Sequence, residues 1–318
     1  MIVPTQDAGI VARLKSFGGA VPSAAISYII RRAAPGPLAS KLCEMVDAYP
    51  AWFALVDRSI RVPTPFGFSI WCDRSEHIGR SLVKTGQWEG LLSRTILACL
   101  GPGCVAIDIG SNIGYDTMLM STAVGADGTV LSVEPDHRNL AYLLRNLHQL
   151  RHANVVVLSA GVGDCLGLAN ITLATDVNRG QSNLRPGAAG ASQPLLVLRL
   201  DALVAESDRR RIGFVKIDVE GFEYKVIQGM GRLVDRVDVL TCEVVPAYLQ
   251  QCGASAEALF GTMREFGFTS FCAPSNFDGR WVPSGPDFRS GGNSLNQFDA
   301  LFCRSINPAL APLIDGMG

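Results

Sequence analysis

The sequence predicts an α/β fold in which a mainly parallel sheet is covered by helices on both faces. Short runs of Val, Ile and Leu alternate with helical segments from about residue 91 onwards, as buried parallel strands do. Hydrophobic residues make up 48% of the 318 residues and charged residues only 18%, which leaves ample apolar material for a core. A small, mainly helical N-terminal extension is expected before the sheet.

Prolines divide the N-terminal part of the chain into short segments. Four of them interrupt it before residue 60, namely Pro22, Pro35, Pro37 and Pro50. Proline ends or kinks helices, so short helices are expected here, followed by a short strand at residues 68–71. We predict an N-terminal module at 1–85, a main domain at 86–304 and a C-terminal tail at 305–318.

Seven segments have the composition of strands of one sheet. A helix is expected before the first strand, at residues 91–100, and helices separate most of the first five strands, including one at residues 139–150. The seven strands are expected at residues 105–107, 129–133, 155–159, 213–219, 237–244, 268–272 and 298–304. Two further strands, 169–174 and 195–200, flank a loop rich in Gly, Asn and Ser. The connection 273–296 is far longer than a hairpin loop of about 2–5 residues, which indicates a functional role.

Composition excludes several classes of protein. The formal net charge is −1, so the chain lacks the basic field of a nucleic-acid binder. Its nine cysteines are an odd number without a CxxC pair, which favours a reducing, cytoplasmic location. The longest early uncharged run, residues 16–30, is shorter than the roughly 20 apolar residues of a spanning helix, so no transmembrane segment is predicted.

A glycine-rich segment follows the first strand and opens a helix. It reads Asp108-Ile-Gly110-Ser-Asn112-Ile-Gly114, and its glycines let the backbone approach a ligand closely at the carboxyl end of the sheet. Asp108 suits the amino group of a methionine moiety. The spacing differs from the G-x-G-x-x-G of dinucleotide enzymes, which argues against an NAD-linked oxidoreductase. A plain glycine-rich turn is the alternative.

Acidic residues also follow the next two strands. Glu134 ends the second strand, where a carboxylate can accept hydrogen bonds from ribose hydroxyls. Gly163 and Asp164 follow the third, where small residues would let an adenine ring lie flat and Asp164 would accept from its amino group. A helix or turn cap is the alternative role of Asp164.

At this point the sequence resembles FkbM-type S-adenosylmethionine (SAM)-dependent methyltransferases, which are Rossmann-like enzymes. The resemblance spans residues 86–304, about two thirds of the chain. It depends on the segments Val105–Tyr115, Val133-Glu-Pro-Asp136, Leu144-Arg-Asn146 and, above all, Lys216-Ile-Asp-Val-Glu-Gly-Phe-Glu223. Gln87-Trp88-Glu89 resembles the aromatic–Glu step before the first strand, whereas Ser111 departs from the more usual Ala.

The resemblance implies a seven-stranded sheet with an antiparallel final strand, SAM as methyl donor, and a hydroxyl acceptor on a sugar, polyketide or other small molecule. Together with the motifs above it assigns eight residues to the cofactor: Glu89, Asp108, Gly110, Asn112, Gly114, Glu134, Gly163 and Asp164.

The fourth strand predicts the reaction centre. Lys216, Asp218 and Glu220 are spaced by two residues and would lie on one face of an extended strand. Removing a hydroxyl proton requires a positioned base, for which Asp218 is the first candidate and Glu220 the second. Lys216 would steady the developing alkoxide or hold the carboxylates. A structural network of ion pairs is the alternative.

Three residues are assigned to the acceptor. Ser182 belongs to a small polar loop that resembles one of the family, and Glu243 ends the fifth strand. Trp281, with Phe277, lies in the long connection, which is expected to form a lid that stacks on a sugar or apolar acceptor. The alternatives for this connection are an exposed loop or the contact of a homodimer.

Two questions stay open at this stage. Asp218, Glu220 and Glu243 supply hard oxygen ligands, but no spacing requires an ion, so no metal is assigned. A SAM-binding scaffold without catalysis is the main alternative function, and an NAD-linked oxidoreductase is the weaker one.

Overall fold

The computed structural model describes residues 35–48, 58–204, 210–274, 279–284 and 296–317. The chain divides into two compact units. An N-terminal unit comprises Met1–Trp88 with Asp176–Asn178, and a sheet unit comprises Glu89–Thr175 with Arg179–Gly318. The helices expected before residue 35, and Phe277, lie outside the described residues.

The described part of the N-terminal unit contains both helices and strands. Its elements are α3 (Pro37–Ala48), β1 (Ser59–Pro63), β2 (Ser69–Asp73) and α4 (His77–Thr85). The two strands pair antiparallel, and their alternate residues Ile60, Val62, Ile70 and Cys72 are buried. Helical residues outnumber strand residues in this part, as expected of a mainly helical extension. The strand expected at 68–71 is β2, whereas β1 was not recognised in the sequence.

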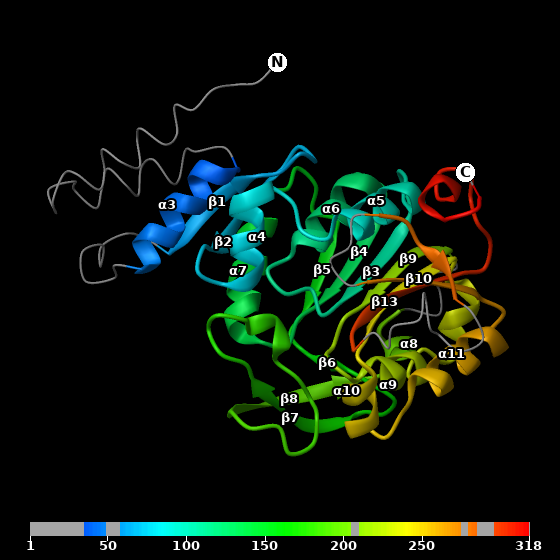
Figure 1. The fold of residues 1–318 in the computed structure, drawn as a ribbon. Coiled ribbons are helices and arrows are strands. Elements are labelled where there is room, and N and C mark those ends of the chain that lie inside the picture. Colours follow the sequence, from blue (N-terminus) through cyan, green and yellow to red (C-terminus); the bar gives the residue numbers. More distant parts are fainter. Residues whose placement is uncertain (1–34, 49–57, 205–209, 275–278, 285–295, 318) are drawn as a thin grey trace, which may run out of the picture. The chain divides into compact units, whose positions relative to one another are not determined.

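The sheet unit is built on one large sheet, visible as adjacent arrows in Figure 1. Its strand order is β12-β11-β13-β10-β9-β3-β4-β5. The strands are β3 (Val105–Ile109), β4 (Thr129–Val133), β5 (Val155–Leu158), β9 (Ile212–Ile217), β10 (Val239–Val244), β11 (Thr269–Pro274), β12 (Val282–Pro283) and β13 (Phe298–Cys303). Five neighbouring strands of this sheet, β10, β9, β3, β4 and β5, are parallel to one another. Strand β13 is antiparallel to both of its neighbours, β10 and β11.

The predicted fold, a mainly parallel sheet with an antiparallel final strand, is confirmed. All seven predicted strands are present, and the two-residue β12 adds an eighth in the described chain. The chain runs outward from β3 through β4 to β5 and then returns to β9 on the other side of β3. Ligands of such sheets bind at the carboxyl ends of the strands beside this reversal.

Helices cover both faces of the sheet. The longer ones are α5 (Gly90–Cys99), α6 (Tyr115–Val124), α7 (His137–Leu147) and α11 (Ala256–Glu265), and the shorter ones are α8 (Leu200–Leu203), α9 (Glu223–Gln228), η2 (Gly231–Arg236) and α10 (Pro246–Gln251). Helix α6 packs on β3 and β4, whereas α9 and α11 pack on β10 and β11. Among the described residues, no helix combines the length and apolar character needed to cross a membrane.

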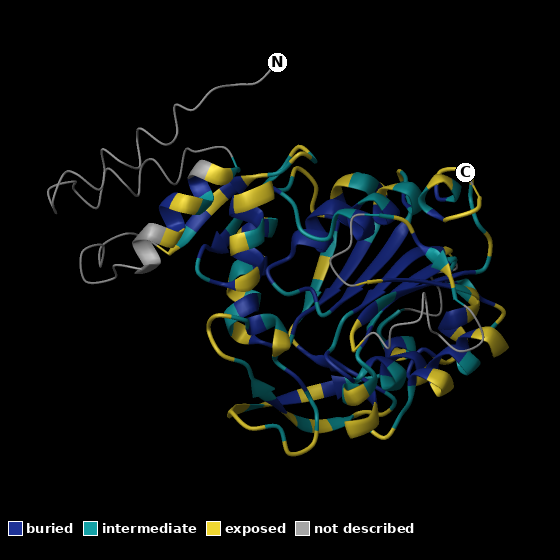
Figure 2. Cartoon of the chain, in the orientation of Figure 1, coloured by how far each residue is buried: buried dark blue, intermediate teal, exposed yellow. Residues whose placement is uncertain are grey.

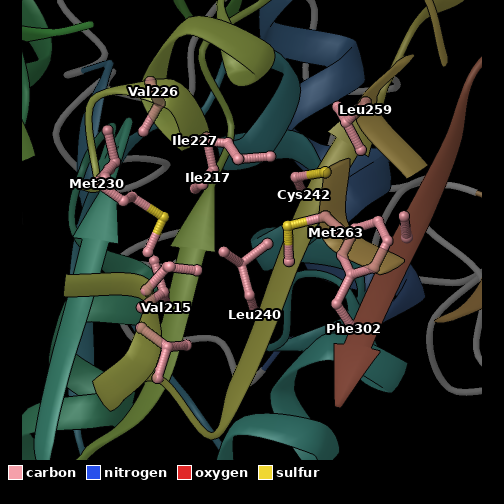
Figure 3. Close-up of a cluster of buried hydrophobic side chains, with 14 of the residues drawn as sticks. Val215, Ile217, Val226, Ile227, Met230, Leu240, Cys242, Leu259, Met263 and Phe302 are labelled. Atoms are coloured by element: carbon pink, nitrogen blue, oxygen red, sulfur yellow. The ribbon is translucent and has the colours of Figure 1, made fainter. Parts of the chain in front are cut away.

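Alternation along the strands separates an apolar face from a polar one. Figure 3 shows Val215, Ile217, Leu240 and Cys242 packed with side chains of α9 and α11 on one face. Since successive side chains point to opposite faces, Lys216 and Thr241 face the other side. Strands β9 and β10 are almost entirely buried, as the dark blue centre of the large sheet in Figure 2 shows, so these polar side chains lie inside the protein.

A second, three-stranded sheet follows β5, in the order β6-β8-β7. Its strands are β6 (Gly161–Val162), β7 (Gly167–Leu173) and β8 (Ala191–Leu198), and the 3-10 helix η1 (Arg179–Gln181) lies in the connection between β7 and β8. The two strands expected here are therefore present. Strand β6, which was not expected, begins only two residues after β5.

The described part of the long connection is anchored in the sheet unit. Trp281 donates its backbone N–H to Leu313 O (2.8 Å) and accepts at its carbonyl from Asp315 N (2.8 Å). Leu310 and Ile314 are buried, and η4 (Ala311–Leu313) lies between them. The segment predicted as a tail thus packs on the sheet unit.

Candidate active site

The glycine-rich loop joins β3 to α6 and has a backbone that few side chains permit. Gly110, Asn112 and Gly114 have φ angles of 82°, 50° and 88°, in the left-handed region that favours glycine. A Cβ on Gly110 would overlap the carbonyl oxygen of Asp218, and one on Gly114 would lie 2.5 Å from Leu143 Cδ1. The loop therefore brings the backbone of β3 against the end of β9.

Beside this loop lies a cavity with about 560 Å³ of empty space, part of it open to solvent; we call it the glycine-loop cavity. Its wall includes Gly110, Asn112, Glu134, Ala160, Gly161, Val162, Arg179, Ser182, Leu184, Asp218 and Val219. It combines the loop, the end of β4, the start of the small sheet and the end of β9.

Glu134 lies at the wall of this cavity and is only 5% exposed. Its two carboxylate oxygens accept hydrogen bonds from the backbone N–H groups of Asn112 (2.7 Å) and Asp136 (2.8 Å). Burial raises the pKa of Glu134 to about 7, although these two N–H groups lower it. Each carboxylate oxygen has a second lone pair, so Glu134 retains capacity to accept further hydrogen bonds from a ligand.

Ser182, which is predicted to lie near the acceptor, also lines the glycine-loop cavity. Its hydroxyl donates to Asp136 Oδ2 (2.7 Å) and accepts from Ala174 N (3.0 Å). Burial alone would raise the pKa of Asp136, but the hydrogen bonds from Arg138 and Ser182 have the larger effect. The pKa of Asp136 therefore lies below its usual value. Ser182 thereby ties the loop after β7 to the end of β4.

Gly163 and Asp164 are not among the residues that line the cavity, and their contact with an adenine ring stays a prediction. Asp164 Oδ2 accepts a hydrogen bond from Lys225 Nζ (3.1 Å). A Cβ on Gly163 would lie 2.9 Å from Phe222 Cε1, so this glycine serves close packing. Just before Gly163, β6 pairs with β8 and not with a strand of the large sheet.

Asp108 lies beneath the loop, is fully buried, and lines neither cavity described here. Its Oδ2 accepts from Thr117 Oγ1 (2.5 Å), and its Oδ1 lies 3.7 Å from Lys216 Nζ. The structure thus gives Asp108 partners inside the protein, and its contact with the cofactor stays a prediction.

Lys216 joins several carboxylates on the polar face of the sheet. Its Nζ donates to Gly110 O (3.2 Å) and Asp218 Oδ2 (3.3 Å), and it lies 3.8 Å from Asp116 Oδ2. Burial lowers the pKa of Lys216, but the charges of Asp218, Asp108, Asp116 and Glu89 raise it well above its usual value. Lys216 is therefore a buried cation that holds carboxylates in place.

Three predicted residues meet at the carboxyl ends of β9 and β10. Carboxylate oxygens of Asp218, Glu220 and Glu243 all lie within 4.8 Å of one another. Glu220 was predicted to reach this position by alternation along an extended strand, and that reason is wrong. Strand β9 ends at Ile217, and Glu220 lies in the following turn with a φ of 54°. Burial and the neighbouring carboxylates raise the pKa of Glu220 to about 8 and that of Glu243 to about 10.

A second cavity, with about 290 Å³ of empty space, lies next to these carboxylates; we call it the acidic cavity. Its polar wall consists of Glu89, Lys216, Asp218, Thr241, Glu243 and Asp299. Glu89 precedes α5 with a φ of 44°. Burial and the charges of Asp299, Asp116 and Asp218 raise its pKa well above the usual range. Asp218 lines both cavities.

Trp281 forms part of the apolar wall of the acidic cavity. It is only 1% exposed, and its Nε1 donates to Thr95 Oγ1 (2.8 Å). Trp281 is therefore not part of an exposed loop, and in this structure it is a buried part of the cavity wall.

Sequence reasoning missed Asp116, Asp299 and Thr241. Asp116 follows the glycine-rich loop directly, and its position in the first turn of α6 was a usable signal. Asp299 lies opposite Glu243 in the antiparallel register of β10 and β13, which no local pattern reveals. Burial raises the pKa of Asp116 to about 7 even though Lys216 lowers it.

Comparison with known protein families identifies the family of this chain. The sequence profile of the methyltransferase FkbM domain matches residues 108–270, a little over half of the chain. A second profile, of protein-L-isoaspartate(D-aspartate) O-methyltransferase, matches residues 46–167. The search of curated proteins returned no relative.

The solved structures that match this chain are distant from it in sequence. An rRNA methylase from Streptococcus thermophilus is 12% identical, with 67% of this chain and 93% of that chain covered and a TM-score of 0.39. A SAM-dependent O-methyltransferase from Thermotoga maritima is 11% identical. The match covers 68% of this chain and 65% of that chain, with a TM-score of 0.38. TYW2 from M. jannaschii, solved in complex with AdoMet, is 12% identical. The match covers 78% of this chain and 88% of that chain, with a TM-score of 0.39.

The profile match extends from Asp108 on β3 to Ser270 on β11 and thus includes the glycine-rich loop, Glu134 and the carboxylates after β9. It excludes the NAD-linked alternative. The chain belongs to the FkbM methyltransferase family, and SAM is its cofactor.

Proposed function

We propose that this FkbM-family methyltransferase transfers the methyl group of SAM to a hydroxyl oxygen of a sugar, a polyketide or another small molecule. The observation that carries the proposal is the position of Asp218, which lines the glycine-loop cavity and the acidic cavity at once. A group at this position touches both a cofactor in the first cavity and an acceptor in the second.

The residues of the glycine-loop cavity fit SAM. Glu134 can accept hydrogen bonds from the ribose hydroxyls beside the two backbone bonds it already makes. The buried Asn112 Oδ1 has no hydrogen-bond partner among the described residues, so a donor on the ligand would satisfy it. Ala160, Gly161 and Val162 supply a small apolar wall for an adenine ring.

Bound SAM supplies an electrophilic methyl group: the C–S bond breaks, its electron pair stays on sulfur, and a bond to the acceptor oxygen forms. Asp218 accepts the hydroxyl proton and orients the acceptor oxygen. Lys216 keeps Asp218 in place from the buried side, at 3.3 Å. Glu89, Glu243 and Trp281 shape the acceptor site, and Glu220 is less suited as base because it lines neither cavity.

The carboxylates favour a hydroxyl over an amine as acceptor. An amine must lose its proton before its lone pair can attack a methyl group. Carboxylates within about 4–6 Å stabilise the protonated, unreactive form. A hydroxyl has no such competing cationic form at neutral pH, and it profits from a nearby base.

The first test is calorimetric titration of the full chain with SAM, S-adenosylhomocysteine and NAD. We expect micromolar binding of both sulfur compounds and none of NAD. A screen of hydroxylated acceptors with labelled SAM follows, in which Asp218→Asn should lower turnover by about 10²–10⁴-fold while SAM binding persists. The exposed Glu257→Gln on α11 serves as the control and should retain full turnover.

Two outcomes would contradict the proposal. Unchanged turnover of Asp218→Asn on the true acceptor would remove Asp218 from the role of base. Tight binding of SAM without turnover on any acceptor would favour the scaffold alternative.

A further inference from the structure

We propose that Asp218, Glu220 and Glu243 bind a divalent metal ion at the edge of the acidic cavity. The role of the ion in catalysis rests on the proposed function, whereas its binding does not. Oxygen atoms of the three carboxylates all lie within 4.8 Å of one another. Ca²⁺ binds oxygen ligands at about 2.3–2.6 Å and Mg²⁺ at about 2.0–2.1 Å, so two oxygens on one ion are at most about 5 Å apart on Ca²⁺ and about 4 Å apart on Mg²⁺. The three carboxylates are therefore spaced for an ion of the size of Ca²⁺ and would close slightly around Mg²⁺.

The backbone holds these three side chains together. In the parallel register Cys242 lies opposite Ile217, so Glu243 on β10 and Asp218, the first residue after β9, follow at the same level. Glu220 is brought back toward them by its left-handed backbone, with a φ of 54°. Glu223 fixes this turn by accepting hydrogen bonds from Val219 N (3.2 Å) and Gly221 N (3.0 Å). The ligand positions are therefore set before an ion arrives.

An independent observation indicates that a ligand belongs in this cavity. Thr241 lies two residues before Glu243 on β10, so both side chains project from the same face of the sheet. It lines the acidic cavity with Asp218 and Glu243. Thr241 is only 3% exposed, and its Oγ1 is buried without a hydrogen-bond partner among the described residues. A buried hydroxyl without a partner is unfavourable, and a water on a bound ion, or the ion itself, would satisfy it.

The charges around the cavity also favour a cation. Glu89, Asp218, Glu243 and Asp299 line it, and Lys216 is the one cation among its described lining residues. The Lys216 ammonium also lies 3.7 and 3.8 Å from Asp108 and Asp116, so its charge is shared with carboxylates outside the cavity. The nearby cation Arg185 does not line the cavity. Its Cζ lies over the Tyr248 ring, 3.5 Å from the ring centroid. A donor set made of oxygens alone is typical of Mg²⁺, Mn²⁺ or Ca²⁺.

In the proposed reaction the ion would bind the acceptor hydroxyl. A divalent cation lowers the pKa of an oxygen bound to it. The O–H bond would break with its electron pair left on the oxygen, and the proton would pass to Asp218. Asp218 can ligate the ion through one carboxylate oxygen and accept the proton on the other.

Manganese is the probe that tests the binding site. The full chain is stripped with EDTA, freed of the chelator and titrated with Mn²⁺, and free ion is followed by electron paramagnetic resonance. We expect one Mn²⁺ per chain, displaced by Mg²⁺ or Ca²⁺. Glu243→Gln and Glu220→Gln should each weaken binding at least about tenfold, because each removes one charged ligand. The matched control Glu257→Gln, exposed on α11, should bind Mn²⁺ like the unaltered protein.

SAM titration of the same samples separates this proposal from the proposed function. A chain that binds SAM but no Mn²⁺ at millimolar concentration would overturn the metal site and leave the methyltransferase assignment intact. Equal Mn²⁺ affinity in the unaltered protein and in both Gln variants would also overturn it. Retained SAM binding in each variant shows that it is folded, so a loss of Mn²⁺ in that variant supports the site.

Discussion

The two cavities on either side of Asp218 are built in different ways. The glycine-loop cavity is shaped mainly by backbone: Gly110 and Asn112 adopt left-handed conformations, and Glu134 is held by two backbone N–H groups. The acidic cavity is shaped by side chains, chiefly the carboxylates of Glu89, Asp218, Glu243 and Asp299 around Lys216. The first therefore depends on conformation and the second on charge.

This difference has a functional meaning. A wall made of backbone changes only if the fold changes, which suits a cofactor that is always the same. A wall made of side chains on strand ends can be altered residue by residue without loss of the sheet, which suits the choice of an acceptor. Substitutions in the two cavities should thus have different signatures, and four experiments examine this.

The largest effect on stability is expected from Lys216→Met. The ammonium is 7% exposed and faces Asp108, Asp116 and Asp218, so its removal leaves buried carboxylates without a counter-charge. We expect a loss of about 3–5 kcal/mol in the free energy of unfolding at pH 7, measured by urea denaturation. The loss should shrink on acidification, because the carboxylates then become neutral.

Lys225→Met is the matched control for that experiment. Lys225 pairs with Asp164 at 3.1 Å, but both side chains are about one third exposed. Water screens such a pair, so its loss should cost at most about 1 kcal/mol. Equal losses in the two variants would mean that Lys216 is not the central charge of the acidic cavity.

The next effect concerns the backbone of the glycine-loop cavity. Gly110 and Gly103 have nearly the same φ, 82° and 83°, but only a Cβ on Gly110 meets other atoms. Gly103→Ala should therefore cost only the left-handed strain of about 1–2 kcal/mol and leave SAM binding unchanged. Gly110→Ala should cost about 1–3 kcal/mol more, because of the overlap with Asp218, and should abolish SAM binding.

Denaturant unfolding and SAM calorimetry on both alanine variants check this pair. Unimpaired SAM binding by Gly110→Ala would show that the loop tolerates movement and that its conformation does not define the cavity.

A smaller effect is expected from the titration of Glu134. Its pKa is about 7 in the folded chain, because burial outweighs the two backbone N–H groups. The ionised form is the better acceptor for ribose hydroxyls, so SAM affinity should rise by up to about tenfold per pH unit below pH 7 and level off above it. Without SAM, the free energy of unfolding depends on pH in the opposite direction to SAM affinity. The folded chain keeps the Glu134 proton, whereas the unfolded chain releases it above the usual pKa of a glutamate. Stability therefore falls as pH rises from about 4.5 to 7.

Glu134→Gln is the control for the titration. It should bind SAM more weakly, since its amide group cannot accept from both backbone N–H groups, and its affinity should no longer vary with pH in this range. The same pH profile in the variant would assign the titration to another group, such as Asp116 with its pKa of about 7.

The glycine-loop cavity was also the more predictable of the two regions. The sequence predicted β4 to the residue at both ends, Thr129–Val133, and hence the position of Glu134 at the carboxyl edge of the sheet. These features are local, because a strand, its end and the turn that follows are encoded within a few residues. Where pairing involves distant residues the prediction was less complete: β6, which pairs with β8 and not with the large sheet, was not expected.

The acidic cavity depends on contacts that a single sequence does not reveal. Asp299 faces Glu243 only through the antiparallel register of β10 and β13. Glu220 reaches Asp218 through a turn with a φ of 54° and not through strand alternation. Trp281, in a segment that looked like a loop, is buried by contacts with α5 and with the C-terminal segment.

The smallest effect, and one that distinguishes a fixed wall from a lid, is expected for Trp281→Phe. Phenylalanine keeps most of the buried ring but loses the hydrogen bond from Nε1 to Thr95 Oγ1 (2.8 Å). Thr95 retains its own donor bond to Leu91 O (2.8 Å), so we expect a loss of about 1 kcal/mol in the free energy of unfolding. SAM affinity should not change, since Trp281 does not line the glycine-loop cavity.

A double-mutant cycle with Thr95→Val measures this bond directly, because the two substitutions should be less than additive when they remove the same contact. A lid that closes on the acceptor would give the opposite pattern: no change in stability, additive substitutions, and an effect on turnover alone. The acidic cavity is lined mainly by charged side chains. On the expected result its Trp281 wall would nevertheless be as rigid as the backbone of the glycine-loop cavity. That rigidity would keep the acceptor aligned beside Asp218.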